Sequence, residues 1–175
     1  LRLLEDDGLI KLQAGRNGGA VVTNPDTSQI MSNIDLLLRL QHTGTQEVHE
    51  AQRLIEPLVV QLAIEKATPE DLARIRETID LIEAHPEDVD LVRLQSNRFH
   101  TLLGAATRNN VLAIVAAIVR QIVVDLKYEG DAKEALSIAR IHRRILEAIE
   151  AKDVDGAVRR SLRHIDASEQ VMCSR

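Results

Sequence analysis

The sequence predicts a mainly helical protein of six or seven helices, preceded by a short β-hairpin. Two observations support this fold class. From about residue 28 to the end, apolar residues recur with the helical period, and helix start and stop signals divide the stretch. Residues 9–22 differ, because two short β-prone runs flank a Gly-rich turn that contains Asn17-Gly18. The expected helices span residues 28–41, 46–66, 69–84, 87–107, 110–128, 131–151 and 154–172.

Capping residues mark two of the helix starts. Thr68 offers a capping hydroxyl, Pro69 follows in the first turn, and the next two residues are acids that face the positive end of the helix dipole. The run from His85 to Asp88 repeats this pattern. The segment 111–126 is apolar nearly all round, which predicts that it is the central and most buried helix.

Composition places the chain among ordinary globular proteins. Its 175 residues are 45% hydrophobic and 28% charged, enough for one buried core and a small appendage. The longest apolar run, residues 111–119, is far shorter than the roughly 20 residues of a membrane span, and no signal peptide is recognisable, so we expect a cytoplasmic protein. The single cysteine, Cys173, leaves histidines and carboxylates as the candidate metal ligands.

The charge distribution separates the two parts of the chain. Residues 1–22 are neutral overall, so the whole net charge of -5 lies on the remainder. Phosphate binding needs clustered Lys and Arg, and base stacking needs aromatics, of which the chain has only Phe99 and Tyr128. We therefore expect that the large helical part is not a nucleic-acid surface. Because the first residues look like the end of a helix, we also expect a preceding segment.

Three of the six histidines lie on the apolar stripes of three different predicted helices. These are His100, His142 and His164. One interpretation is that each is a core histidine satisfied by a backbone carbonyl or by water. The other is a shared site for a divalent ion such as Zn²⁺ or Ni²⁺, which favours neutral imidazole and can take one ligand from each helix of a bundle. Spacing alone leaves both open.

Several motifs together resemble the GntR family of winged-helix regulators. Leu3-Leu4-Glu5, Gly8-Leu9-Ile10 and the stretch from Gly15 to Val22 resemble the end of a recognition helix and the wing. The remainder resembles the FCD (FadR C-terminal domain) branch, and the separation of 22 between His142 and His164 makes the set specific. The matching residues there are Glu50, Leu54-Ile55-Glu56-Pro57, Leu62-Ala63, Phe99-His100, Leu103, Asn109 or Asn110, His142 to Leu146, Ala148-Ile149, Asp153, Ala157 and His164.

The resemblance implies an architecture and a function. Residues 1–24 would be the remnant of a winged helix-turn-helix domain, and residues 25–175 an antiparallel bundle of six or seven helices for effector binding and dimerisation. Such a protein is not an enzyme. It binds operator DNA as a homodimer, and a small-molecule effector that enters the bundle changes its affinity for DNA.

At the hairpin tip, Arg16, Asn17 and Gly18 are implied to contact DNA. Because the two helices that precede a wing are not in this chain, we expect the chain alone to bind DNA weakly or not at all.

Many members of this family hold a metal through one Asp and three His, with the Asp four residues before the first His. Carried over, the three histidines are His100, His142 and His164, the same three that lie on the apolar stripes. At the Asp position this chain has Ser96, with Asn97 beside it, so the first carboxylate ligand is lost. Three neutral imidazoles can still hold Zn²⁺ or Ni²⁺ with open coordination positions. An apolar or neutral effector without a metal is the alternative.

The pocket region departs from the family pattern in a second way. Four residues before Glu56, where the family usually has an Arg, this chain has Gln52. Arg53 is displaced by one residue, which rotates its side chain by about 100° around the helix, so it is not a direct replacement. The candidate effector-binding residues are Gln52, Arg53, Ser96 and Asn97.

Two other function classes are compatible with the same residues. Three imidazoles and an open position could activate water in a metal-dependent hydrolase. Against this, no glutamate sits next to the histidines as an obvious general base, and the wing would have no purpose. The other class is a purely structural helical dimerisation module, in which the histidines only pack.

Overall fold

The computed structural model describes residues 2–6, 10–13, 15, 18–22, 33–34, 36–38, 40–124 and 130–173. The chain divides into two compact units, Leu1–His42 and Thr43–Arg175. The domain boundary expected after residue 24 lies outside the described residues, as does most of the helix expected over 28–41.

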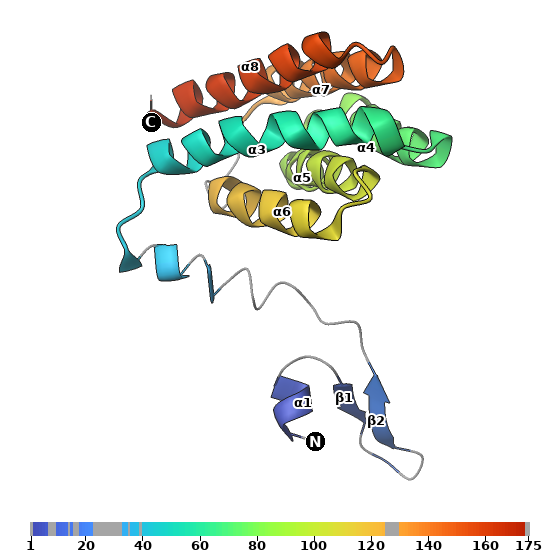
Figure 1. Cartoon of the computed structure of the whole chain (residues 1–175), viewed down its shortest axis with the longest axis vertical. Helices are drawn as coiled ribbons and strands as arrows, with labels where there is room; N and C mark the ends of the chain where they lie inside the picture. Colours follow the sequence, from blue (N-terminus) through green and yellow to red (C-terminus); the bar gives the residue numbers. More distant parts are fainter. Residues whose placement is uncertain are drawn as a thin grey trace. The chain divides into compact units, whose positions relative to one another are not determined.

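The N-terminal unit contains the predicted β-hairpin (Figure 1). Strand β1, Ile10–Gln13, pairs antiparallel with β2, Gly19–Val22, and the short helix α1, Arg2–Asp6, precedes them. Gly15 has a φ of 129°, a conformation that glycine adopts without strain, and its carbonyl accepts a hydrogen bond from the Gly18 N–H at 2.8 Å. The hairpin predicted from the two β-prone runs is confirmed.

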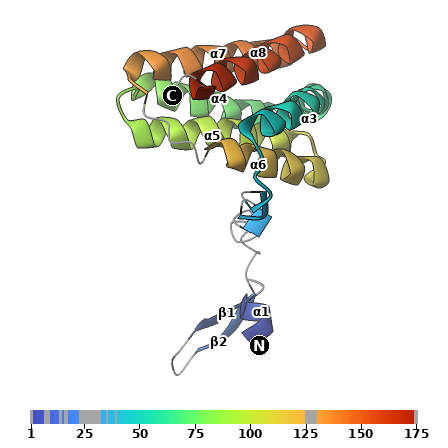
Figure 2. The same cartoon turned by 90° about the vertical axis from the view of Figure 1, so that its left-hand side faces the viewer.

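The described residues of the C-terminal unit form six helices, arranged as a closed ring (Figure 2). Around the ring the order is α3, α8, α7, α4, α5 and α6, and α3, α5 and α7 also touch one another across its centre. Every predicted helix of this unit is present, and the described ends lie within two residues of the expected ones, apart from the end of α6 expected at residue 128, which lies outside the described residues. The helices are α3 Thr45–Lys66, α4 Pro69–Ala84, α5 Val89–Ala106, α6 Asn110–Val124, α7 Ala132–Glu150 and α8 Val154–Cys173.

Side-chain caps start the helices where the sequence indicated. The hydroxyl of Thr68 accepts a hydrogen bond from the Asp71 N–H at 3.2 Å, and the Asp71 carboxylate accepts one from the Thr68 N–H at 3.0 Å. Helix α5 begins two residues later than expected. The reason is that Asp88 is its cap and accepts a hydrogen bond from the Leu91 N–H at 3.0 Å.

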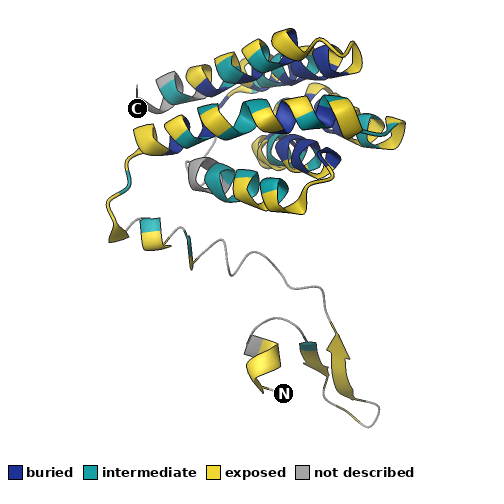
Figure 3. Ribbon diagram, viewed as in Figure 1, coloured by how far each residue is buried: buried dark blue, intermediate teal, exposed yellow. Residues whose placement is uncertain are grey.

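The core lies inside the ring, where the buried faces of the helices meet (Figure 3). Each fully buried aliphatic or aromatic side chain stabilises the fold by about 1.5–3 kcal/mol relative to an exposed one. The largest of these buried apolar side chains are Phe99, Ile75, Ile79, Ile82, Leu103, Ile145 and Leu146.

Helix α6 is not the central, most buried helix that its sequence predicted. It packs on α3 and α5 at the rim of the ring, and its Val111 side chain is 73% exposed. A helix that is apolar all round can turn any of its faces to the core, so the periodicity of its sequence did not identify the face that is exposed.

Among the described residues no helix, α6 included, is long and apolar enough to cross a membrane. The exposed large apolar residues of α3 and α6 are Leu54, Leu58, Val111, Ile114 and Val115.

We predict that Gly156→Ala destabilises the protein, although alanine is the better helix former. A Cβ at Gly156 would collide with Asp153 and Arg160. The Asp153 carboxylate accepts a hydrogen bond from the Gly156 N–H at 2.9 Å at the start of α8, and the collision would break it. The free energy of unfolding in a denaturant titration should fall by about 1–2 kcal/mol.

The matched control is Gly44→Ala at the start of α3, where a Cβ would meet nothing closer than 3.8 Å. That variant should lose about 0.5–1 kcal/mol, the difference between glycine and alanine as an N-cap, with no steric contribution, and so less than Gly156→Ala. A gain of stability in Gly156→Ala would contradict the steric argument.

Candidate metal and effector site

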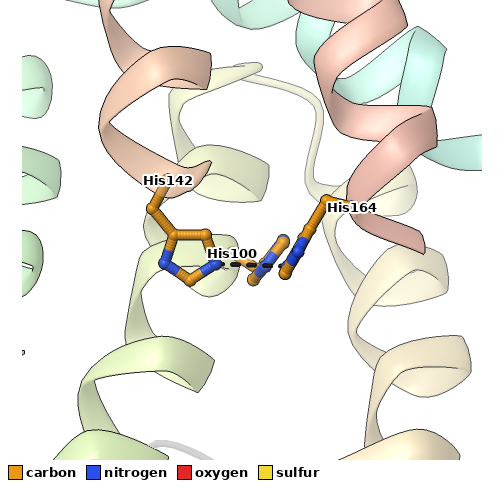
Figure 4. A group of neighbouring side chains, drawn as sticks. All are labelled: His100, His142 and His164. Atoms are coloured by element: carbon orange, nitrogen blue, oxygen red, sulfur yellow. Dashed lines mark hydrogen bonds between the residues drawn. The ribbon is translucent and has the colours of Figure 1, made fainter. Parts of the chain in front are cut away.

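Three imidazoles from three helices meet inside the ring (Figure 4). His100 lies on α5, His142 on α7 and His164 on α8, and one nitrogen from each lies within 4.8 Å of the others. The Nε2 atoms of His142 and His164 are 3.2 Å apart. His100 and His142 are buried and His164 is half-buried. The three apolar stripes therefore bring these side chains into one cluster.

The orientation of two of the rings is set by neighbours from α3 and α5. Phe99, fully buried, stacks on His142 with ring centroids 4.0 Å apart and planes 1° from parallel. Glu56 on α3 places its Oε1 at 3.0 Å from Nδ1 of His100. A carboxylate that accepts a hydrogen bond from Nδ1–H leaves the lone pair of Nε2 free, which is the usual arrangement behind a metal-binding histidine.

Glu56 corrects one step of the sequence argument. The expectation that no glutamate lies beside the histidines is wrong, because Glu56 contacts His100 from a different helix. Its carboxylate is engaged with the imidazole, so it orients the ring. The available signal was that Glu56 is the only charged residue in the apolar stretch from Leu54 to Ile64.

A half-buried cation, Arg120 on α6, also acts on the cluster, and its Nε atom is buried. Burial raises the pKa of Glu56, and the positive charge of Arg120 opposes that rise; the same charge adds to the effect of burial in lowering the pKa of all three histidines. Desolvation lowers the pKa of Arg120 itself to about 10, so it stays protonated at neutral pH. Sequence reasoning missed this residue, although it is the only charged side chain within α6.

Burial keeps the three imidazoles neutral. Desolvation is the main cause that lowers the pKa values of His100 and His142 well below 6.5 and that of His164 to about 4. Desolvation also raises the pKa of Glu56, against the charges of Arg120 and His164, which lower it. Neutral imidazoles have a free lone pair at physiological pH, which is the form that binds metal.

The donor set fits a divalent ion. Nε2 of His100, Nδ1 of His142 and Nε of Arg120 are buried and find no hydrogen-bond partner among the described residues. Each such group costs about 1–3 kcal/mol, and a bound ion is one explanation for the free Nε2 of His100; Nδ1 of His142 and the N–H of Arg120 would need another partner. Zinc with Zn–N bonds of about 2.0–2.1 Å in a tetrahedron needs nitrogens about 3.3 Å apart, which the pair His142 and His164 nearly matches. The most distant pair of nitrogens, within 4.8 Å, would have to close by up to about 1.5 Å, which is within reach of side-chain rotation.

The predicted effector-binding residues lie in different surroundings. Ser96 is half-buried, one turn before His100 on the same face of α5, with half-buried Asn97 beside it. Gln52 is buried on α3, and its Oε1 lies 2.9 Å from Nδ1 of His49. Arg53 pairs instead with two carboxylates of α8, Asp166 at 3.0 Å and Glu169.

Comparison with known proteins identifies the family. The FCD domain model matches residues 47–167. The HTH-type transcriptional regulator YdhC of Bacillus subtilis (strain 168) is 31% identical over 173 residues, which is 95% of this chain and 69% of YdhC. The chain belongs to the FCD family of GntR-type transcription regulators. The predicted family and function are thereby confirmed at this level: the chain is part of a ligand-responsive regulator of transcription.

Other relatives agree with this assignment of the FCD domain. The galactonate operon transcriptional repressor of Escherichia coli (strain K12) is 26% identical over 122 residues, 68% of this chain and 53% of the repressor. The regulator LutR of Bacillus subtilis is 25% identical over 98% of this chain and 81% of its own length. Two solved structures share the fold. Streptococcus agalactiae GntR has a TM-score of 0.73 at 22% identity, covering 97% of this chain and 78% of that one, and E. coli McbR/YncC has 0.59 at 20%, covering 98% and 79%.

The wing residues of the regulator are only partly described. Arg16 and Asn17 lie outside the described residues, and Gly18 is exposed at the turn between the strands. Their predicted contact with DNA stays a prediction.

We predict that the metal-free FCD domain loses stability as the pH falls from about 6.5 toward 4. The folded-state pKa of His164 is about 4 against 6.5 in a free histidine, so the unfolded chain binds protons first in this window. The contribution of His164 is fully present above 6.5 and is lost on acidification, with a slope of up to about 1.4 kcal/mol per pH unit.

The measurement is urea unfolding across this pH range with a chelator present. The comparison variant is His164→Gln, whose side chain does not titrate. All other titratable groups are the same in both proteins, so the difference between the two pH profiles is due to His164. Its stability should depend on pH less steeply than that of the parent. Parallel curves for the two proteins would show that burial does not hold His164 neutral.

Proposed function

We propose that the FCD domain senses its effector through a divalent transition metal, Zn²⁺ or Ni²⁺, held by His100, His142 and His164. The observation that carries the proposal is the meeting of three neutral imidazoles, one from each of three helices, within 4.8 Å. Three protein ligands leave coordination positions open, and a bound ion there supplies a Lewis acid for oxygen donors of an effector.

The residues around the cluster support an effector site on the same side of the bundle. Ser96 and Asn97 offer neutral polar groups next to His100, and Gln52 offers a buried amide on α3. Arg53, on the α3 surface toward α8, is the fourth candidate. The unpaired buried nitrogens of the cluster favour a metal-bound polar effector over an apolar one, because an apolar molecule would leave them unsatisfied.

Regulation then follows from a population shift. An effector that binds one arrangement of the helices more tightly than another favours that arrangement, and with it a different affinity for operator DNA. In this proposal Arg16, Asn17 and Gly18 of the wing contact the DNA. The regulator works as a cytoplasmic homodimer.

The metal is tested by elemental mass spectrometry on dialysed protein. We expect about one equivalent of zinc or nickel, or uptake of one equivalent on incubation with either ion, as a single three-histidine site requires. His142→Ala should lose the ion. His85→Ala, which removes an exposed histidine at the end of α4, should keep it. No uptake by the parent, or equal uptake by both variants, would rule the site out.

The homodimer has its own test. The exposed apolar residues of α3 and α6 form surfaces that a second copy could cover, so Leu54→Glu should weaken self-association about tenfold or more. Leu136→Glu is the control, because α7 does not adjoin α6 and this side chain is also exposed. Sedimentation velocity over a concentration series measures both. A dimer that is insensitive to Leu54→Glu would place the interface elsewhere.

A further inference from the structure

Arginine side chains gather on the outward side of α7 and α8, two helices that pack side by side (Figures 1 and 2). All of them are exposed, and none forms an ion pair or a side-chain hydrogen bond among the described residues. We call this surface the arginine face. It consists of the α7 pair, Arg140 and Arg144, and the α8 pair, Arg159 and Arg163.

The alignment of the two helices shows that the two pairs adjoin each other. Helices α7 and α8 are antiparallel because only residues 151–153 connect them, and the Nε2 atoms of His142 and His164 are 3.2 Å apart. Arg163, one residue before His164, is therefore level with the middle of the α7 pair, and Arg159 lies one turn nearer the connection. With a rise of 1.5 Å per residue and helix axes 8–10 Å apart, the arginine face measures roughly 10 by 10 Å.

Ion pairs on both sides show that the arginine face points away from the bundle. Toward α4, Arg143 pairs with Asp80 at 2.7 Å. Toward α3, Asp166 pairs with Arg53 at 3.0 Å. Positions two residues before and after His142 are rotated by about 200° from this inward side chain. The arginine face lies between these ion pairs and is open to solvent.

The arginine face places like charges close together without compensation inside the chain. Each pair has the spacing i, i+4, which is unfavourable when the two charges have the same sign. The two pairs are also neighbours across the helices, so repulsion between helices adds to repulsion within each helix. A chain with a net charge of -5 has acidic residues to spare, yet none is paired with these guanidinium groups among the described residues. Local conflicts of this kind are expected at functional surfaces.

The surroundings favour a short acidic segment over nucleic acid as the partner. Glu147 on α7 and Asp155 on α8 are exposed at the end of the arginine face nearest the connection, and Asp166 lies along its α3 side. A DNA duplex, with a phosphate charge about every 1.7 Å of its axis, is longer than the face and would meet these carboxylates. About two turns of an acidic peptide helix fit within 10 Å.

We propose that the arginine face docks a short acidic segment of a partner protein, whose carboxylates pair with the guanidinium groups of α7 and α8. The planar guanidinium suits this role because it binds a carboxylate through two parallel hydrogen bonds. Exposed ion pairs are individually weak, so the contact is transient and serves to steer and orient the partner. The proposal does not depend on a metal or an effector in the histidine cluster.

The test measures binding of fluorescently labelled hexaglutamate to the whole chain by anisotropy, with hexaglutamine as the uncharged comparison. Hexaglutamate should bind at least about tenfold more tightly at low salt, as several weak ion pairs together allow. The difference should shrink as salt is added, because exposed charges are screened. A labelled DNA duplex of about 20 base pairs is titrated under the same conditions, a length chosen to exceed the face.

Two double variants assign the binding to the arginine face. Arg144→Gln with Arg163→Gln should lower hexaglutamate affinity about tenfold and leave DNA binding unchanged. Its melting temperature should not fall, because the substitutions relieve repulsion. The matched control is Lys66→Gln with Arg74→Gln, which makes the same change in net charge at exposed, unpaired positions of α3 and α4 and should have little effect.

Three outcomes would overturn the proposal. Equal binding of the two peptides would show that the arginine face is only a solvated surface. Equal loss in the two double variants would show that overall charge, and not this face, attracts the acidic peptide. If Arg144→Gln with Arg163→Gln lowers DNA binding and leaves hexaglutamate binding unchanged, the face contacts nucleic acid.

Discussion

Desolvation of a polar cluster inside the helical ring is the constraint on which the rest of the site depends. Three helices each place a histidine where an apolar residue would pack with less cost, and burial holds those imidazoles neutral. The contacts around them offset part of that cost. Phe99 covers one face of His142, and Glu56 accepts a hydrogen bond from the Nδ1–H of His100. Some buried nitrogens of the cluster still have no hydrogen-bond partner among the described residues. These unpaired nitrogens are available to bind an ion or a ligand.

The helices and the three histidines could be predicted from the sequence because both follow local rules. Helix ends are set by caps such as Thr68 and Asp88, within a few residues of the groups that they satisfy. A histidine on an apolar stripe must face the interior, whichever helix it then meets. Local rules do not say how helices are rotated around the ring. For that reason Glu56, 44 residues from His100, was not recognised as its partner, and the exposed face of α6 was expected to be buried.

Arg53 and Arg120 show that the position of a charged residue along its own helix does not predict whether its charge acts on a pocket. Arg53 is one residue from Gln52, which occupies the position of the family's pocket arginine. Its side chain is nevertheless about one third exposed and pairs with carboxylates of α8. Exposed ion pairs of this kind contribute about 0–1 kcal/mol. Arg120 is far away in the sequence, but its charge is desolvated and reaches Glu56 and every histidine of the cluster. In a medium of lower polarity the same charge has a much larger effect.

Helix α3 connects the site to the rest of the regulator. It extends over 22 residues, about 33 Å, and begins two residues after the boundary between the two compact units. Near its middle, Glu56 contacts His100 and Arg53 pairs with α8, which also carries His164. In the proposed mechanism, a ligand that draws the three imidazoles together acts on α3 through the contact between Glu56 and His100, because the exposed pairs of Arg53 contribute little.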